Sequence, residues 1–119
     1  MSKIEKFEDL ICWQKARELV KGIYKLAEPD KFKKDYSLID QIRRASVSIM
    51  LNISEGFALR TSKEFKRHLF LAHGSVAEVQ SVLYIAKDLN YIDSENFRKY
   101  YDNCTEISKI LSGLIKSIN

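Results

Sequence analysis

The side chains of this chain that could take part in chemistry are concentrated between positions 41 and 56. Five polar residues there step by three or four positions, which places them on one face of a helix: Gln41, Arg44, Ser48, Asn52 and Glu55. Ser75 and Glu78 lie farther along the chain and are also three residues apart. If these residues form a catalytic site, Glu55 and Glu78 are its acid and base.

A structural role explains the same residues without a reaction. A buried polar group costs roughly 1–3 kcal/mol when it has no hydrogen-bond partner, and Asn52 falls on the apolar stripe of its segment. We therefore predict that these seven residues pair across two helices and fix the helix register, as polar core residues do in coiled coils. No histidine, nucleophile or phosphate-binding loop joins them in the sequence pattern, so we prefer this role to catalysis.

The histidines and cysteines do not complete a reactive site in the sequence. His68 and His73 are five residues apart, so they do not share a helix face. Glu64 and His68 have the one-turn spacing of two metal ligands, but the sequence offers no third ligand beside them. Cys12 and Cys104 fit apolar helix positions, where we expect buried, reduced thiols. The sequence thus predicts no metal, no cofactor, no small-molecule substrate and no enzymatic activity.

Basic residues at the start of the third predicted helix are the candidates for binding an anionic partner. The segment 59–68 contains four basic residues and one acidic residue, and the net charge of the chain is +4. Together with one arginine of the preceding helix, we predict these phosphate-contacting residues: Arg43, Arg60, Lys63, Lys66 and Arg67. Because no base-reading motif is present, the expected binding is sensitive to salt and weakly sequence-specific. An ordinary solvated helix face is the alternative.

Four amphipathic segments must position these residues. Apolar residues recur with helical spacing over Glu8 to Ala27, Leu38 to Ala58, Thr61 to Asn90, and from Asp93 or Ser94 onward. The residues on the four apolar stripes are Cys12, Ala16, Leu19, Ile23 and Leu26; Leu38, Ile42, Ala45 and Ile49; Phe65, Leu69, Ala72, Val76, Val79, Leu83 and Ala86; and Phe97, Tyr101, Cys104, Ile107, Leu111, Leu114 and Ile118.

Local signals mark the ends of these helices. Residues 29–35 form a polar segment that opens with the only proline, so we predict a loop there. Ser37 with Asp40 resembles a capping pair, and Thr61 begins a second one. Gly56 stands where a left-handed residue would close the second helix.

Length and composition fit one all-helical domain. The chain has 119 residues with 4 Gly and 1 Pro, which is too few turn residues for a sheet-rich fold. Short connections between long helices predict an antiparallel, up-down-up-down four-helix bundle over residues 1–119. The start of the chain is charged, and no apolar run approaches the roughly 20 residues of a membrane span. We therefore expect a cytoplasmic protein that does not bind a membrane.

The helices carry more apolar residues than one core needs, since a bundle helix needs about three in seven. Residues lying off the main stripes include Trp13, Val20, Tyr24, Met50 and Phe57, and a line formed by Phe70, Ala77, Tyr84 and Tyr91. Wide stripes could fill a bulky core. Burial of a second face against another copy of the chain is the alternative, and it predicts a closed homo-oligomer.

Several short motifs resemble one bacterial family. The motifs are Phe7-Glu-Asp-Leu10, Trp13-Gln-Lys-Ala16, Gln41-Ile-Arg-Arg-Ala45, Ser48-Ile49, Asn52-Ile-Ser-Glu-Gly56, and Ala72-His-Gly-Ser75 with Glu78. This pattern is similar to the proteins encoded in intervening sequences of 23S ribosomal RNA genes, and the accessory variability protein of diversity-generating retroelements looks like a relative. Ser46 and Ser54 depart from it, standing where residues such as alanine are common. The resemblance implies an up-down-up-down bundle, a homopentameric ring, association with RNA or DNA through basic surfaces, and no enzymatic activity.

Two functions follow from these observations, and both work by association. The first is an oligomeric, non-catalytic module that binds RNA or DNA. The second is a protein–protein adaptor without a nucleic-acid role, in which the extra apolar residues contact a partner. Catalysis through Glu55 or Glu78 is the third and least supported hypothesis.

Overall fold

The computed structural model describes residues 3–118, except for the side chain of Asp30, and consists of helices within that range. A short 3-10 helix η1 (Phe7–Asp9) leads into α1 (Ile11–Leu26), and a five-residue helix α2 (Asp30–Lys34) follows. Three long helices complete the chain: α3 (Tyr36–Ala58), α4 (Ser62–Asp88) and α5 (Ser94–Ser117). The predicted all-α bundle is therefore confirmed.

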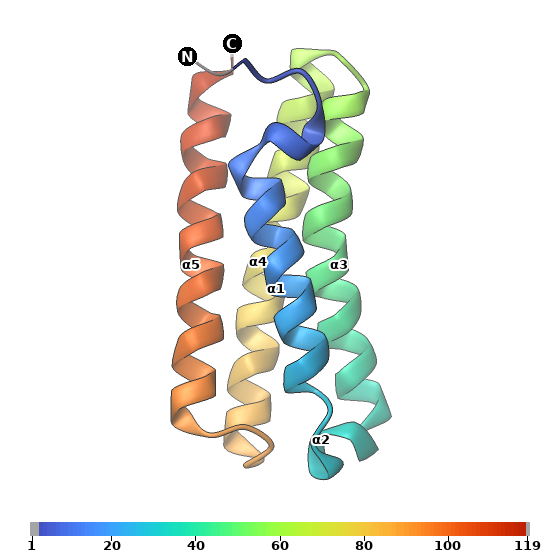
Figure 1. Cartoon of the computed structure of the whole chain (residues 1–119), viewed down its shortest axis with the longest axis vertical. Coiled ribbons are helices and arrows are strands. Elements are labelled where there is room, and N and C mark those ends of the chain that lie inside the picture. The colour runs from blue at the N-terminus through green and yellow to red at the C-terminus, as the bar shows by residue number, and fades with distance from the viewer. Residues whose placement is uncertain (1–2, 119) are drawn as a thin grey trace.

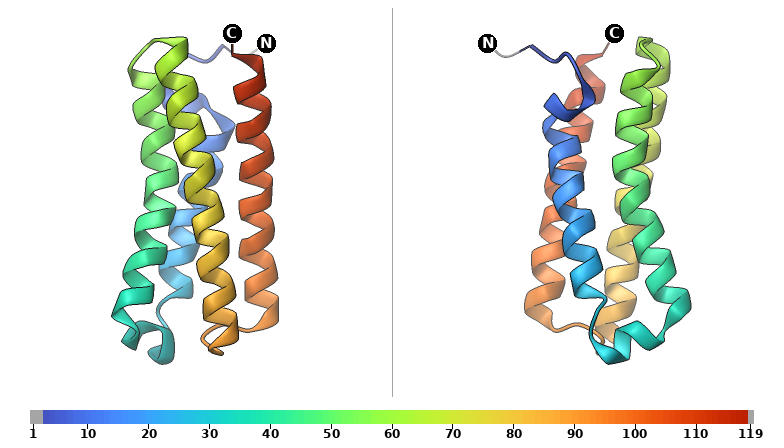
Figure 2. Two further views of the ribbon diagram at one scale, coloured as in Figure 1. Left: turned by 180° about the vertical axis from the view of Figure 1, so that it is seen from behind. Right: turned by 45° about the vertical axis from the view of Figure 1, so that its right-hand side comes forward.

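The four long helices run up, down, up and down and form an elongated bundle of 44 × 23 × 19 Å (Figure 1). Each helix packs against two others, so the order around the bundle is α1, α3, α4, α5. The most extensive contact is between α3 and α4, which lie side by side in both views of Figure 2. The α3–α4 turn, the segment before η1 and the end of α5 lie at one end of the bundle, and α2 and the α4–α5 turn lie at the other (Figure 1).

The predicted stripes form the core. All five stripe residues of α1 are buried, and so are the stripe residues of α4 from Leu69 to Ala86. On α5 the inner stripe residues are buried, whereas Tyr101, Leu114 and Ile118 are partly exposed. The spacing of apolar residues was thus enough to orient the four long helices.

The polar segment after α1 differs from its prediction. Residues 30–34 are helical rather than a loop, and Phe32 is fully buried there, with its ring stacked 5.4 Å from the ring of Tyr91. Asp35 caps α3 by accepting a hydrogen bond from the backbone N–H of Leu38, so the predicted Ser37–Asp40 pair is not the cap. One buried aromatic residue therefore anchors a segment whose other residues are mostly polar.

Gly56 was also misassigned. It lies inside α3 and is buried, and the residue with a left-handed backbone is Arg60, at φ 64° in the turn after the helix. A Cβ atom at position 56 would lie 2.5 Å from the Cβ of His68 on α4. The glycine is therefore needed for the close approach of two helices rather than for a turn.

Residues outside the stripes divide between the core and the surface. Trp13 is buried, and Val20, Met50 and Phe57 are partly buried. Phe70 is 58% exposed on α4. By length and composition alone, α4 is apolar enough to cross a membrane, but core helices of soluble proteins meet the same criterion, and the inner face of α4 is buried here.

Candidate nucleic-acid interface and the polar layer between α3 and α4

Part of the predicted polar network joins α3 to α4. The Gln41 amide Nε2 donates a hydrogen bond of 2.7 Å to Glu78 Oε2, and the hydroxyls of Ser48 and Ser75 lie 3.0 Å apart. Asn52 donates from Nδ2 to the carbonyl oxygen of Ser48 at 2.9 Å and to its hydroxyl at 3.1 Å. The Gln41–Glu78 and Ser48–Ser75 contacts join α3 to α4 at two levels, seven residues apart along α3, so they oppose sliding of one helix along the other.

Arg44 does not belong to this network. Its Nε lies 2.8 Å from Asp40 Oδ2 on the same helix, and both side chains are largely exposed. The spacing of Arg44 did place it on the same side of α3 as Gln41 and Ser48. The prediction failed because an acidic residue one turn away is a nearer partner than anything on α4.

Glu55 joins α3 to α4 through a histidine, which the sequence pattern did not predict. Its Oε1 lies 3.2 Å from Nε2 of His68, which is 3% exposed. The other ring nitrogen, Nδ1, lies 2.9 Å from the carbonyl oxygen of Glu64 and donates to it. The two ring nitrogens therefore lie beside oxygen atoms of both helices, Glu55 on α3 and Glu64 on α4.

The two carboxylates considered for catalysis are far apart. Glu55 contacts His68, whereas Glu78 contacts Gln41, and 14 residues separate positions 41 and 55 along α3. At about 1.5 Å per residue this distance is about 21 Å, whereas paired carboxylates that act on one bond are about 5–9.5 Å apart. Glu55 and Glu78 therefore do not form an acid–base pair.

Four of the five predicted phosphate-binding residues lie together at the α3–α4 end of the bundle. Arg60 is exposed in the turn with its guanidinium 5.4 Å from the Phe57 ring centre, and Lys63 is exposed on the first turn of α4. Lys66 is partly exposed, and Arg67 is exposed and pairs with Glu64 at 3.1 Å. The turn geometry thus concentrates basic side chains at this end.

Arg43 is not part of that group. Fifteen residues of α3 separate it from Ala58, which corresponds to about 22 Å. Its guanidinium carbon lies 4.7 Å from the ring centre of Tyr24 on α1, and its Nε is buried without a hydrogen-bond partner among the described residues. The sequence did not show that Arg43 lies apart from the other four basic residues, because the distance along the bundle axis between residues of adjacent helices cannot be read from their positions in the sequence alone.

A family model described as "23S rRNA-intervening sequence protein" matches residues 8–113 of the chain, nearly its whole length. The chain belongs to this family. A solved structure from Bacteroides thetaiotaomicron, of a protein of unknown function from the S23 ribosomal protein family, has the same fold. It has a TM-score of 0.81 and 27% sequence identity, and the match covers 89% of this chain and 99% of that one. A search of the curated proteins gave no match.

This member of the 23S rRNA-intervening sequence protein family has a second polar layer, between α4 and α5, that its sequence did not predict. His73 Nε2 lies 2.9 Å from the Ser108 hydroxyl and 3.2 Å from that of Ser112, and Gln80 donates to the Thr105 hydroxyl at 3.1 Å. Serines at helix positions 108 and 112 are one turn apart, which was the available signal. These contacts lie among partly exposed residues and pair the outer edges of the two helices.

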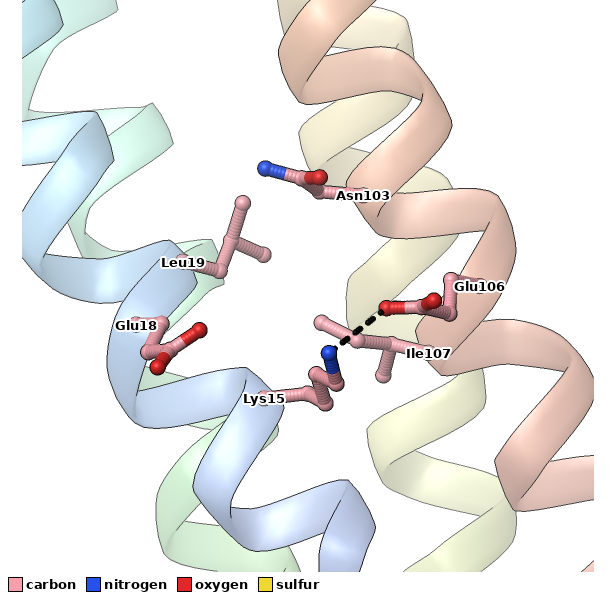
Figure 3. Close-up of a pocket in the computed structure, with 6 residues that line it drawn as sticks. All are labelled: Lys15, Glu18, Leu19, Asn103, Glu106 and Ile107. Carbon is pink, nitrogen blue, oxygen red and sulfur yellow. Dashed lines mark ion pairs between the residues drawn. The ribbon is translucent and has the colours of Figure 1, made fainter.

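The cleft between α1 and α5 is too small for a substrate. Figure 3 shows it between Leu19 and Ile107, where Lys15 and Glu106 bridge the two helices at 3.3 Å. Its volume is about 50 Å³, whereas ligand pockets usually have about 300–1,000 Å³. Among the side chains that the structure describes, which exclude that of Asp30, no group of three or more histidine, cysteine or acidic residues is arranged to hold a metal ion.

The two thiols are buried and protected from ionisation. Burial raises the pKa of Cys12 to about 11 and that of Cys104 to about 12, from an ordinary value of 9.0. Thiolates are the reactive form of cysteine, so these residues are poor nucleophiles at neutral pH. This agrees with the prediction of buried, small apolar side chains.

The raised thiol pKa values predict a loss of stability in alkali. Above pH 9 the unfolded chain releases both thiol protons while the folded chain keeps them, so the free energy of unfolding falls by about 1.4 kcal/mol per pH unit for each thiol up to the folded pKa. Urea unfolding at pH 9.5 and 10.5 measures this slope. The double variant Cys12→Ala, Cys104→Ala should show a slope shallower by about 2–3 kcal/mol per pH unit. Equal slopes in the two proteins would contradict the assignment.

Proposed function

We propose that this protein is a non-catalytic homo-oligomer that binds RNA or DNA through the basic side chains around the α3–α4 turn. The observation that carries this proposal is the exposure of Arg60, Lys63 and Arg67 together at one end of the bundle. A single copy presents few charges, but a closed oligomer repeats the same end several times. Because phosphate-backbone affinity grows with the number of contacts, self-assembly would convert a weak patch into a usable binding surface.

Exposed apolar residues on α3 and α4 support self-assembly. Leu51 on α3 is 56% exposed, and Leu71 and Ile85 on α4 are 47% and 45% exposed. Phe70, which precedes Leu71 on α4, is also exposed. Large apolar patches on a monomer are uncommon and often mark an interface. The number five for the oligomer rests on the family resemblance, and the cytoplasmic location that we propose rests on the charged start of the sequence and the lack of a long apolar run.

The nucleic-acid half of the proposal is tested by the salt dependence of RNA binding. We expect the wild-type protein to bind a labelled RNA at about 50 mM salt and to lose affinity steeply by about 200 mM. The variant Lys63→Gln, Arg67→Gln should bind more weakly, with a shallower slope of log affinity against log salt concentration. The matched control Lys99→Gln, Lys109→Gln removes the same charge from exposed positions of α5 and should retain the wild-type slope. Absent binding, or binding that does not respond to salt, would reject the proposal.

A protein–protein adaptor is the second candidate, and the exposed apolar residues on α3 and α4 favour it. In that case a different protein, rather than further copies of this chain, covers Leu51, Phe70 and Leu71. Purification from cells would then recover one protein partner in a fixed ratio after nuclease treatment. Substitution of the basic residues around the α3–α4 turn would leave that partner bound.

A further inference from the structure

The start of α3 lies at the opposite end of the bundle from the α3–α4 turn, beside α2 (Figure 1). A second group of aromatic and basic residues belongs to this part of the bundle. Tyr36 opens α3 and is 79% exposed, more than any other large hydrophobic side chain described. Tyr24 on α1 is also exposed, and the Arg43 guanidinium lies 4.7 Å from its ring centre. None of these three residues takes part in the polar layers or in the basic group around the α3–α4 turn.

The three side chains are arranged along one surface. Tyr36 and Arg43 are seven residues apart on α3, which is two helical turns, or about 10 Å. They border a shallow hollow on the outer surface of α3 together with Ser37, Ile39 and Asp40. Arg43 reaches from this hollow to the ring of Tyr24, so its guanidinium connects the Tyr24 ring with the surface that Tyr36 borders.

The charges around these rings favour an anionic ligand. Three exposed lysines, Lys31, Lys33 and Lys34, lie on α2 just before Tyr36. The acidic residues nearest in sequence to Tyr36 have partners: Asp35 accepts hydrogen bonds from the Leu38 backbone and the Tyr91 hydroxyl, and Asp40 pairs with Arg44. Exposed aromatic rings beside basic side chains are the arrangement that binds single-stranded nucleic acids, because bases stack on the rings while the cations contact the phosphates.

We propose that Tyr36, Tyr24 and Arg43 form a stacking surface for unpaired bases of RNA or single-stranded DNA. This inference rests on the proposed function, since it assigns part of the nucleic-acid contact to a second site. Bases in a duplex are stacked on each other and present no free face, so this surface discriminates unpaired from paired strands. The basic residues around the α3–α4 turn contact phosphates of either form.

The test compares single-stranded and duplex ligands. Fluorescence anisotropy would be measured with a labelled unstructured 12-nucleotide RNA, the DNA of the same sequence, and the 12-base-pair RNA duplex. Tyr36→Ala should weaken binding of both single strands by about 5- to 100-fold, the effect of losing one stacked base, and leave duplex affinity within twofold of wild type. Tyr36→Phe keeps the ring and should restore single-strand binding. Because Tyr36 is exposed, neither substitution removes a core contact.

The possible failures are distinguishable. Equal affinities of wild type and Tyr36→Ala for the single strands, with salt-sensitive binding intact, would overturn the stacking surface and leave the proposed function standing. A similar loss for duplex and single strands would also overturn it, because the residue would then not discriminate unpaired bases. If wild type binds neither form at low salt, the proposed function fails and the stacking surface fails with it. Loss with the RNA strand alone would restrict the site to RNA, since the ribose 2′-hydroxyl distinguishes the two strands.

Discussion

Replacing Phe32 by alanine is expected to lower the free energy of unfolding by about 3–5 kcal/mol, the usual cost of removing a buried phenylalanine ring. Phe32 has no exposed surface and is the largest fully buried side chain of the described residues. Its ring stacks on Tyr91 with an angle of 22° between the planes, and so joins α2 to the turn before α5. A five-residue helix is too short to be stable alone, so α2 depends on this contact.

Urea unfolding monitored by circular dichroism measures this effect. Lys33→Ala is the matched control, because it changes the neighbouring exposed residue of the same short helix and should alter stability by no more than about 0.5 kcal/mol. A loss below about 1 kcal/mol for Phe32→Ala would mean that the α2 segment does not contribute to the core. The original prediction of a loop over residues 29–35 would then describe it better.

Replacing Gly56 by alanine is expected to destabilise the protein by about 1–2 kcal/mol, although alanine is the better helix former. The added Cβ would lie 2.5 Å from the Cβ of His68 and 3.4 Å from the Cα of Phe65. Neither atom belongs to the flexible end of a side chain, so α3 and α4 must separate. Overpacking of this kind costs about 1–3 kcal/mol, which exceeds the gain of about 0.8–1.0 kcal/mol from helix propensity.

Gly113→Ala provides the matched control, since Gly113 is also helical and no atom lies within 4 Å of an added Cβ. It should gain up to about 1 kcal/mol of stability. The two glycine-to-alanine substitutions are therefore expected to have opposite signs in the same unfolding experiment. A stabilising effect at both positions would contradict the close approach of α3 and α4 at Gly56.

The sequence predicted the long helices because a helix that buries one face has apolar residues recurring with the helical period. Residues such as Ala16, Ile23 and Leu83 recur at the helical repeat, and each is fully buried. The same argument could not find α2, since one aromatic residue among lysines has no periodicity. Tertiary packing, including the stacking of Phe32 on Tyr91, makes this segment part of the core.

For the candidate sites, the sequence predicted which side of a helix a residue lies on but not which residue it contacts. Gln41 and Ser48 lie on the side of α3 that meets α4, as their spacing predicted, whereas Asn52 donates to Ser48 on the same helix. The spacing could not show which residue of α4 each residue of α3 contacts, because this pairing depends on where the α3–α4 turn lies. With a tight turn near position 61, Gly56 faces His68 and Ser48 faces Ser75. In two antiparallel helices, residues at equal distances from the connecting turn lie opposite each other, and this rule would have indicated that Glu55 lies close to His68.

The separation of Arg43 from the other basic residues has the same origin. Arg43 lies far from Arg60 because most of α3 separates them. It contacts Tyr24 because α1 packs on α3 at this level. Neither is encoded in the local sequence around Arg43. This contact changes the role that we assign to the residue, from a phosphate contact beside Arg60 to part of a separate aromatic surface.

The central claim is that this bundle acts by association, and its most direct test is the mass of the wild-type protein in solution. Size-exclusion chromatography with multi-angle light scattering, at micromolar concentration, would give this mass without any nucleic acid present. We predict the mass of a closed homo-oligomer, with five copies of the 119-residue chain. A single peak with the mass of one chain would contradict the claim, because the exposed residues of α3 and α4 would then not be covered by a second copy.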